Sequence, residues 1–125
     1  MEKRELLALC LSQPGAYEDY PFRDSGWAVA RHGPKGKIFA FVFERQGRLC
    51  INLKCEPMRA DFYRHVYSDV GEGYHLNHRH WNTVKLCGDV PLGELREMIH
   101  HSYELTAPKP REANCNQMEL EKKCE

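Results

Sequence analysis

The first quarter of the chain combines one amphipathic segment with an aromatic stretch that has no period. Within residues 3–13, apolar side chains recur at the spacing of one helix face: Leu6, Leu7, Cys10 and Leu11. The Pro14-Gly15 pair follows, so the pattern predicts that a helix ends there. Residues 16–26 contain tyrosines, a phenylalanine, a proline and glycines without alternation, and we expect an irregular aromatic loop.

Three strands are predicted next, at residues 27–31, 37–43 and 49–54, separated by the turn signals Gly33-Pro34-Lys35-Gly36 and Gln46-Gly47. In the second, both alternating sets are apolar, with Ile38, Ala40 and Val42 on one side and Phe39, Phe41 and Phe43 on the other. This pattern is typical of a central strand that is covered on both faces. The third strand places Leu49, Ile51 and Leu53 on a buried face and Cys50, Asn52 and Lys54 on a polar, open face. Short turns favour an antiparallel meander.

The remaining pattern predicts two helices around a short extended region. Pro57 opens a helix to about residue 67, in which Met58, Phe62 and Val66 repeat at i, i+4 and i+8. Residues 68–73 are expected to form a loop, and residues 73–77 and 83–87 two short extended segments. The last helix, residues 91–106, has an inner stripe of Leu92, Leu95, Ile99, Ser102 and Leu105. The sequence therefore predicts one α+β domain, with an antiparallel sheet of a three-strand meander plus one or two short strands and three main helices.

The length and composition of the chain predict one domain followed by a polar tail. With 125 residues and 14.6 kDa, the chain has the size of one domain, which we place at residues 1–108. Residues 109–125 are polar and predict a disordered tail. No segment is apolar enough for a membrane span, and no secretory signal is apparent. We therefore interpret the six cysteines as free thiols of a cytoplasmic protein, with Cys115 and Cys124 in the tail.

Charge is balanced overall and uneven locally. Eighteen basic and eighteen acidic residues argue against nucleic-acid binding by net charge alone. Residues 31–54, however, carry six bases against one acid, which is enough to attract a polyanion locally. Solvated strand edges that use Lys and Arg to prevent aggregation would give the same pattern, so both interpretations stay open.

Residues 73–84, Gly-Tyr-His-Leu-Asn-His-Arg-His-Trp-Asn-Thr-Val, form the most informative segment. It contains no acid and is rich in groups that donate hydrogen bonds or stack on bases. A structural interpretation is also open: Trp81 would fill the core, and Asn77 and Asn82 would cap turns.

The same segment resembles the Gly-Tyr-His-Leu-Asn-x-x-His-Trp-Asn-Thr-Val signature of the MmcQ/YjbR family of small bacterial proteins. Further matching landmarks are Glu18-Asp19-Tyr20-Pro21-Phe22, residues 52–57 and Gly88-Asp89-Val90-Pro91. The resemblance covers residues 3–107 and implies a CyaY-like or double-wing α+β domain that binds DNA. His78 stands where family members often have lysine, which implies weaker and pH-dependent binding.

Three functions follow as hypotheses, and for the favoured one we expect no cofactor. The first is nucleic-acid binding by Lys37, Asn52, Lys54, His75, Asn77, His78, Arg79, His80, Trp81, Asn82, Thr83 and Lys85. The second is a metal or small-molecule site at His75, His78 and His80, with Cys55 or Cys87 as a further donor. The third is docking of a protein partner, through the open sheet face or the aromatic loop of Tyr17, Tyr20 and Phe22. No catalytic motif is recognisable, so we expect a non-enzymatic protein, and we favour a monomer.

Overall fold

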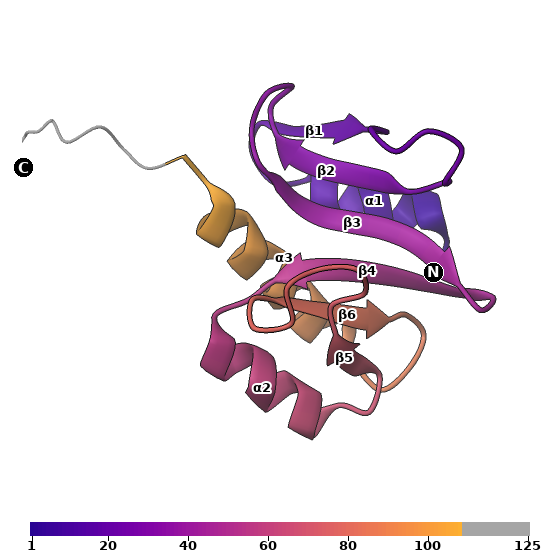
Figure 1. Ribbon diagram of the computed structural model, residues 1–125, viewed down its shortest axis with the longest axis vertical. Helices are drawn as coiled ribbons and strands as arrows, with labels where there is room; N and C mark the ends of the chain where they lie inside the picture. The colour runs from indigo at the N-terminus through magenta and orange to yellow at the C-terminus, as the bar shows by residue number, and fades with distance from the viewer. Residues whose placement is uncertain (109–125) are drawn as a thin grey trace, which may run out of the picture.

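One antiparallel sheet of six strands organises the computed structural model, which describes residues 1–108 (Figure 1). The strands are β1 (Ala16–Asp19), β2 (Ala28–His32), β3 (Ile38–Arg45), β4 (Arg48–Lys54), β5 (Val70–Glu72) and β6 (Trp81–Lys85). Their spatial order is β1-β2-β3-β4-β6-β5. The helices are α1 (Lys3–Leu11), α2 (Pro57–Val66) and α3 (Leu92–Thr106). The α+β architecture, the meander of β2, β3 and β4, and the three helices confirm the sequence prediction.

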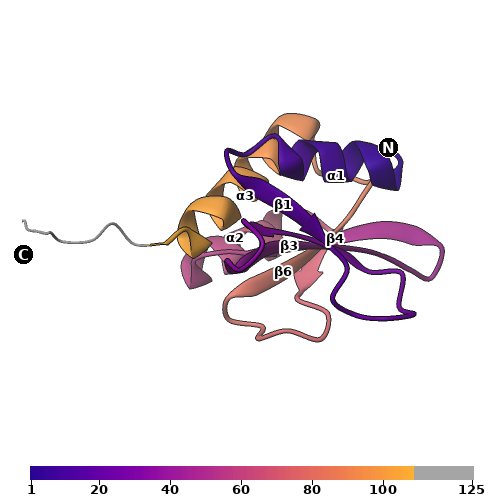
Figure 2. The same ribbon diagram turned by 90° about the horizontal axis from the view of Figure 1, so that it is seen from above.

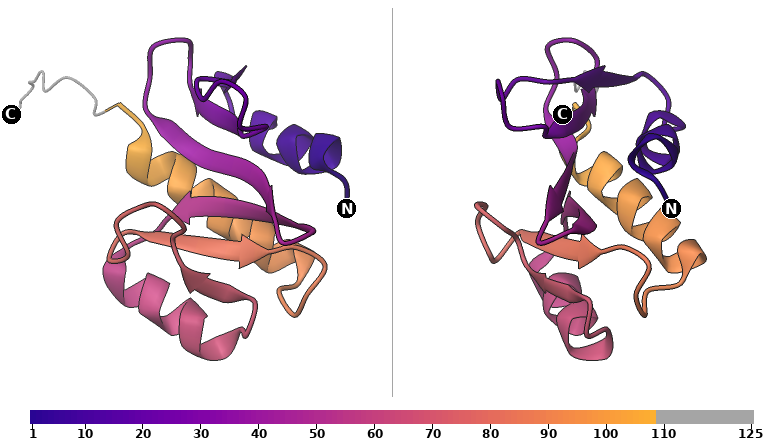
Figure 3. Two further views of the ribbon diagram at one scale, coloured as in Figure 1. Left: turned by 45° about the vertical axis from the view of Figure 1, so that its right-hand side comes forward. Right: turned by 90° about the vertical axis from the view of Figure 1, so that its right-hand side faces the viewer.

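The two faces of the sheet have different coverings. Helices α1 and α3 lie on the same face, while the loops at residues 20–27 and 73–80 hang from the opposite one (Figure 2). Helix α2 lies at the β5–β6 end of the sheet (Figure 3). We call the face opposite α1 and α3 the helix-free face. No helix within residues 1–108 has the length and apolarity needed to cross a membrane.

The core lies between the sheet and helices α1 and α3. Leu6 and Leu7 of α1 and Ile99 of α3 are buried against strand residues such as Val42 and Ile51. Of the predicted stripe on the last helix, Leu95, Ile99 and Ser102 are buried, whereas Leu92 and Leu105 are exposed. The predicted central strand is confirmed, because residues 39–43 of β3 are all buried.

A β-bulge changes the predicted alternation of β3. Ala30 pairs with Ala40 and Arg31 pairs with Ile38, so Phe39 is the extra residue without a partner on β2. Phe39 belongs to the core cluster and meets the Tyr103 ring of α3 edge-on, with centroids 5.3 Å apart. Ile38 lines a cleft on the helix-free face instead. The bulge therefore exchanges the faces predicted for Ile38 and Phe39.

Two strands were absent from the prediction, and one predicted segment is not a strand. Residues 16–19, expected in a loop, form β1, and residues 70–72, also expected in a loop, form β5. Both are short edge strands with polar residues or glycine, so their sequences lack an apolar alternation. Residues 73–77 form turns rather than an extended segment. The second short strand begins at Trp81, two residues earlier than expected.

The apolar repeat of α2 does not face the core. Met58, Phe62 and Val66 are 84%, 58% and 50% exposed. The buried residues of this helix are Ala60 and Tyr63 instead. Spacing on a helix identifies residues that share a face, but it does not tell which face the rest of the fold covers. The predicted tail, with Cys115 and Cys124, lies outside the described residues.

Candidate functional site

A buried polar cluster clamps the start of the 73–80 loop onto the sheet. The amide Nδ2 of Asn52 donates to the carbonyl oxygen of Tyr74 at 3.0 Å, and the Tyr74 backbone N–H donates to Thr83 Oγ1 at 2.8 Å. Thr83 Oγ1 in turn donates to Asn52 Oδ1 at 2.5 Å, across the β4–β6 pair in which these two residues are partners. Asn52 is fully buried and Thr83 nearly so. The open face predicted for Asn52 is therefore wrong, because the 73–80 loop covers it.

Three other signature residues also make structural contacts. Asn82 is buried, and its Nδ2 donates to the Ala60 carbonyl at 3.1 Å, which ties β6 to α2. The side chain of Asn77 accepts the Arg79 backbone N–H at 2.9 Å and so closes a turn, as predicted. Gly73 has no room for a side chain, since a Cβ there would lie 2.7 Å from Trp81 Cβ. Much of the signature thus determines the shape of the loop.

The predicted binding residues that remain accessible lie in several places. Lys37, His75, Asn77, His78, Arg79 and Lys85 are exposed, and Lys54, His80 and Trp81 are half-buried. Lys54 pairs with Trp81 at one end of the β4–β6 ladder, whereas Lys85 pairs with Cys50 at the other. At ~3.3 Å per residue, the two ends are roughly 13 Å apart. The structure therefore spreads these residues along the sheet and the 73–80 loop.

The three signature histidines do not form a metal site. The His75 ring lies on the Tyr74 ring with centroids 3.9 Å apart, and His78 Nδ1 lies 3.4 Å from Glu72 Oε1. Within residues 1–108, no group of three His, Cys, Asp or Glu side chains lies close enough to hold a metal ion. The metal hypothesis therefore has no support in the described part of the chain.

The four cysteines within residues 1–108 are free thiols. Burial raises the pKa of Cys10 to about 12 and that of Cys55 to about 11. Burial also raises the pKa of Cys50, against the opposing effect of Lys85, Arg48 and Arg45. The buried thiols are therefore protonated at neutral pH and are not nucleophiles.

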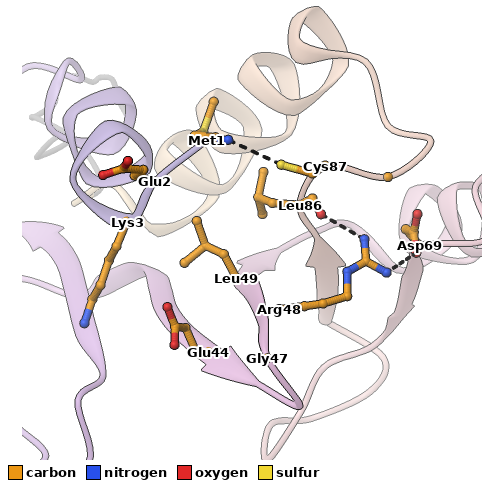
Figure 4. Close-up of a pocket in the computed structure, with 11 residues that line it drawn as sticks. Met1, Glu2, Lys3, Glu44, Gly47, Arg48, Leu49, Asp69, Leu86 and Cys87 are labelled. Carbon is orange, nitrogen blue, oxygen red and sulfur yellow. Dashed lines mark hydrogen bonds and ion pairs between the residues drawn. The ribbon is translucent and has the colours of Figure 1, made fainter.

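A pocket of about 770 Å³ lies beside α1, away from the signature (Figure 4). Its wall is held by Arg48, whose guanidinium donates to the Leu86 carbonyl at 2.8 Å and to Asp69 at 3.1 Å. Cys87 faces the Met1 amino group here, at 3.3 Å. None of the residues predicted to bind nucleic acid lines this pocket. Cys87, expected as a possible further donor to a metal at the signature histidines, lies here instead, and no described hydrogen bond within residues 1–108 joins it to them.

A second cavity, of about 610 Å³, brings the two loops of the helix-free face together. We call it the aromatic cleft. It is lined by Phe22, Ser25 and Trp27 of one loop, Tyr74, His75 and Leu76 of the other, and Ile38, Phe41, Glu44 and Arg45 of β3. Of the residues predicted to bind, it contains only His75, together with Phe22 of the aromatic loop. The aromatic composition of residues 17–27 was a usable signal, but nothing in the sequence joined it to residues 74–76.

Other aromatic side chains pack against Trp27 and hold its ring in the aromatic cleft. Trp27 stacks on the buried Phe43 with centroids 4.1 Å apart and planes 10° from parallel. Phe22 and Phe41 meet Trp27 edge-on, each at 6.2 Å. Phe43 covers one face of the Trp27 indole, and the Trp27 side chain as a whole is half-buried and lines the cavity. Such packing makes Trp27 a fixed platform.

Arg45 supplies the positive charge of the aromatic cleft. Its Cζ lies 4.0 Å from the centroid of the Tyr74 ring, a cation–π contact that leaves the guanidinium N–H groups available. Among the ion pairs described within residues 1–108, none involves Arg45. Glu44 contributes to the lining of both pockets, but it belongs to the opposite alternation set of β3 from Arg45, and Figure 4 draws its carboxylate in the other pocket. The aromatic cleft can therefore accept an aromatic ring that carries a negative charge.

Comparison with known proteins identifies relatives without an assigned activity. A family model described as YjbR matches residues 11–105. The uncharacterized protein YjbR of Escherichia coli K12 is 33% identical over 100 residues, which are 80% of this chain and 82% of that protein. The uncharacterized protein YyaQ of Bacillus subtilis is 29% identical over 103 residues, covering 74% and 86% of the two chains.

Solved structures share the fold. The crystal structure of Deinococcus radiodurans protein DR2400, from the domain family DUF419, superposes with a TM-score of 0.77 at 34% identity, covering 85% of this chain and 78% of that one. A Pseudomonas syringae protein superposes with a TM-score of 0.75 at 24% identity, over 86% of this chain and all of that one. The second likeness concerns the fold alone.

Proposed function

The chain belongs to the YjbR family, and we propose that its helix-free face binds nucleic acid. The observation that carries the proposal is the aromatic cleft, where stacked rings lie beside the guanidinium of Arg45, which has no ion-pair partner within residues 1–108. Flat rings and cations side by side are the chemistry that recognises bases and phosphates. The role is binding without catalysis, in the cytoplasm, and it retains the DNA binding that the resemblance to double-wing proteins led us to expect.

The phosphate contacts come from cations that share the helix-free face. Strand alternation places Arg45, Lys54 and Lys85 on the same side as the buried Asn52 and Thr83. Arg45 and Lys85 also lie near each other, since both act on the Cys50 thiol. Arg79 and Lys37 are exposed as well, but Arg79 lies in a pocket beside α2, together with Asp61 and Glu72. The buried Asn52, Asn82 and Thr83 are excluded from the interface, because their polar groups are engaged within the fold.

Salt dependence tests the proposal. Three neutralised phosphates give a slope of log K against log salt of about −2 to −3. Affinity for a labelled oligonucleotide should therefore fall about 20- to 40-fold between ~50 and ~200 mM salt. Fluorescence anisotropy with single-stranded and duplex DNA measures both quantities.

A matched pair of variants locates the surface. Arg45→Gln removes the charge in the aromatic cleft, whereas Arg96→Gln makes the same change on the exposed side of α3, on the helix-covered side. We expect weaker binding and a slope smaller by about 1 for Arg45→Gln only. If neither DNA binds at ~50 mM salt, or if both variants lose affinity equally, this interface is refuted. Absence of any nucleic-acid complex would favour the protein-partner hypothesis.

A further inference from the structure

We propose that the aromatic cleft is a stacking site for one unpaired nucleobase, so that the nucleic acid bound by this protein is single-stranded. The inference rests on the proposed function and adds the ligand class of its central site. The two observations that carry it are the stacking of Trp27, which lines the cavity, on the buried Phe43 and the position of Arg45 beside the same cavity.

The Trp27 ring is already held in place by its neighbours in the protein alone. Phe43 is 1% exposed and stacks on the Trp27 ring, and Phe22 and Phe41 meet that ring in T-shaped contacts. A base that stacks on Trp27 therefore loses little free energy to ordering the ring. The Tyr74 and His75 rings also line the cavity, with centroids 6.2 and 6.3 Å from that of Trp27 and planes tilted by 32°.

The size and charge of the cavity agree with a nucleotide. Its volume of about 610 Å³ lies within the range of roughly 300–1,000 Å³ that is usual for small-ligand sites. The guanidinium of Arg45, held over Tyr74, can bind the phosphate attached to a base that lies on Trp27. An apolar peptide side chain would use the rings but would leave this cation without a partner.

The walls of the aromatic cleft exclude a base that is paired and stacked in a duplex. The 20–27 loop contributes Phe22, Ser25 and Trp27 on one side, and the 73–80 loop contributes Tyr74, His75 and Leu76 on the other. A base enters between the two loops only after it has left its neighbours, and unpairing costs a few kcal/mol in a duplex but not in a single strand. The structure therefore favours single strands.

Tryptophan fluorescence provides a direct test. The chain has two tryptophans, so a Trp81→Phe variant reports on Trp27 alone. The probes are a deoxythymidine oligonucleotide, an abasic oligonucleotide of the same length and charge, and a duplex of that length. We expect the thymidine strand to quench Trp27 and to bind at least fivefold more tightly than the abasic strand, since one stacked base contributes ~1–3 kcal/mol.

Variants separate this inference from the proposed function. Trp27→Leu should reduce thymidine binding to the level of the abasic strand, whereas Phe62→Leu, an aromatic loss on the exposed side of α2, should not change it. Circular dichroism checks the folding of each variant. The Trp81→Phe protein keeps every residue that lines the aromatic cleft, so its quenching is measured on the unaltered lining. Equal affinity for the thymidine and abasic strands, tighter binding of the duplex, or no quenching overturns the stacking site while nucleic-acid binding stands. No binding of any probe overturns both.

Discussion

The polar cluster beneath the 73–80 loop allows one prediction to be worked out from the structure. Thr83→Val keeps the shape of the side chain and removes its hydroxyl. The part-buried Tyr74 backbone N–H then loses its acceptor, and the fully buried Asn52 Oδ1 loses its donor. The buried Asn52 oxygen left without a partner costs ~1–3 kcal/mol and the part-buried N–H about 1 kcal/mol, so we expect a loss of roughly 2–4 kcal/mol in the free energy of unfolding.

Urea denaturation followed by circular dichroism measures this loss. With a denaturant slope of roughly 2 kcal/mol/M, the midpoint should fall by about 1–2 M. Thr83→Ser is the matched control, because it keeps the hydroxyl and removes only a methyl group, a change of about 1 kcal/mol. Hydrogen exchange at the Tyr74 amide should accelerate in the valine variant only.

The result that would refute the reasoning is a valine variant as stable as the serine variant. The hydroxyl would then contribute nothing, and Asn52 and Thr83 would again be available as ligand contacts. If the valine variant is the less stable, the same change should also weaken single-strand binding, because the cluster holds the Tyr74 wall of the aromatic cleft in place.

Three further predictions concern the turn, the pH dependence and the thiols. Gln46 and the glycine after it both have positive φ, 54° and 77°. Gln46→Asn creates the Asn-Gly pair that a type I′ turn prefers. This variant should raise the free energy of unfolding, measured by urea denaturation, by ~0.5–1 kcal/mol. Burial and the nearby Arg59 lower the pKa of His101, so the unfolded chain binds this proton first. Stability should therefore fall as the pH drops below ~6.5, and His101→Gln should lessen the fall in thermal melts at pH 5–8; equal curves for both proteins would contradict this. Within residues 1–108, iodoacetamide at pH 8 should label the exposed Cys87. It should not label Cys10, because burial raises the pKa of that thiol to about 12. Peptide mass mapping identifies which of the two thiols is labelled.

Sequence alone was sufficient for helix α1 and for the central strand β3. The strand at 37–43, with apolar residues on both sides, is buried and central, as its pattern indicated. The α1 residues Leu6, Leu7 and Cys10 face the core for the same reason. Burial of apolar area is the main stabilising force, so the fold favours the orientation that buries a continuous apolar face. The repeat of Met58, Phe62 and Val66 on α2 is the exception, because it is exposed and the helix buries Ala60 and Tyr63 instead. Edge strands β1 and β5 lack a continuous apolar face, so their pairing could not be predicted from the sequence.

The site depended on the tertiary structure, because it joins segments that are distant in the chain. The motif at 73–84 was recognisable. Its polar side chains, taken together with Asn52, nevertheless have two different roles that the sequence does not distinguish. Asn52 and Thr83 are buried partners that fix the loop, while His75 lines the aromatic cleft. A hydrogen-bonding side chain has the same chemistry in both places, and only the packing of the 73–80 loop over β4 and β6 decides whether water or a ligand can reach it. Trp27 and Tyr74 are 47 positions apart in the sequence, and the sheet alone brings their rings within 6.2 Å of each other.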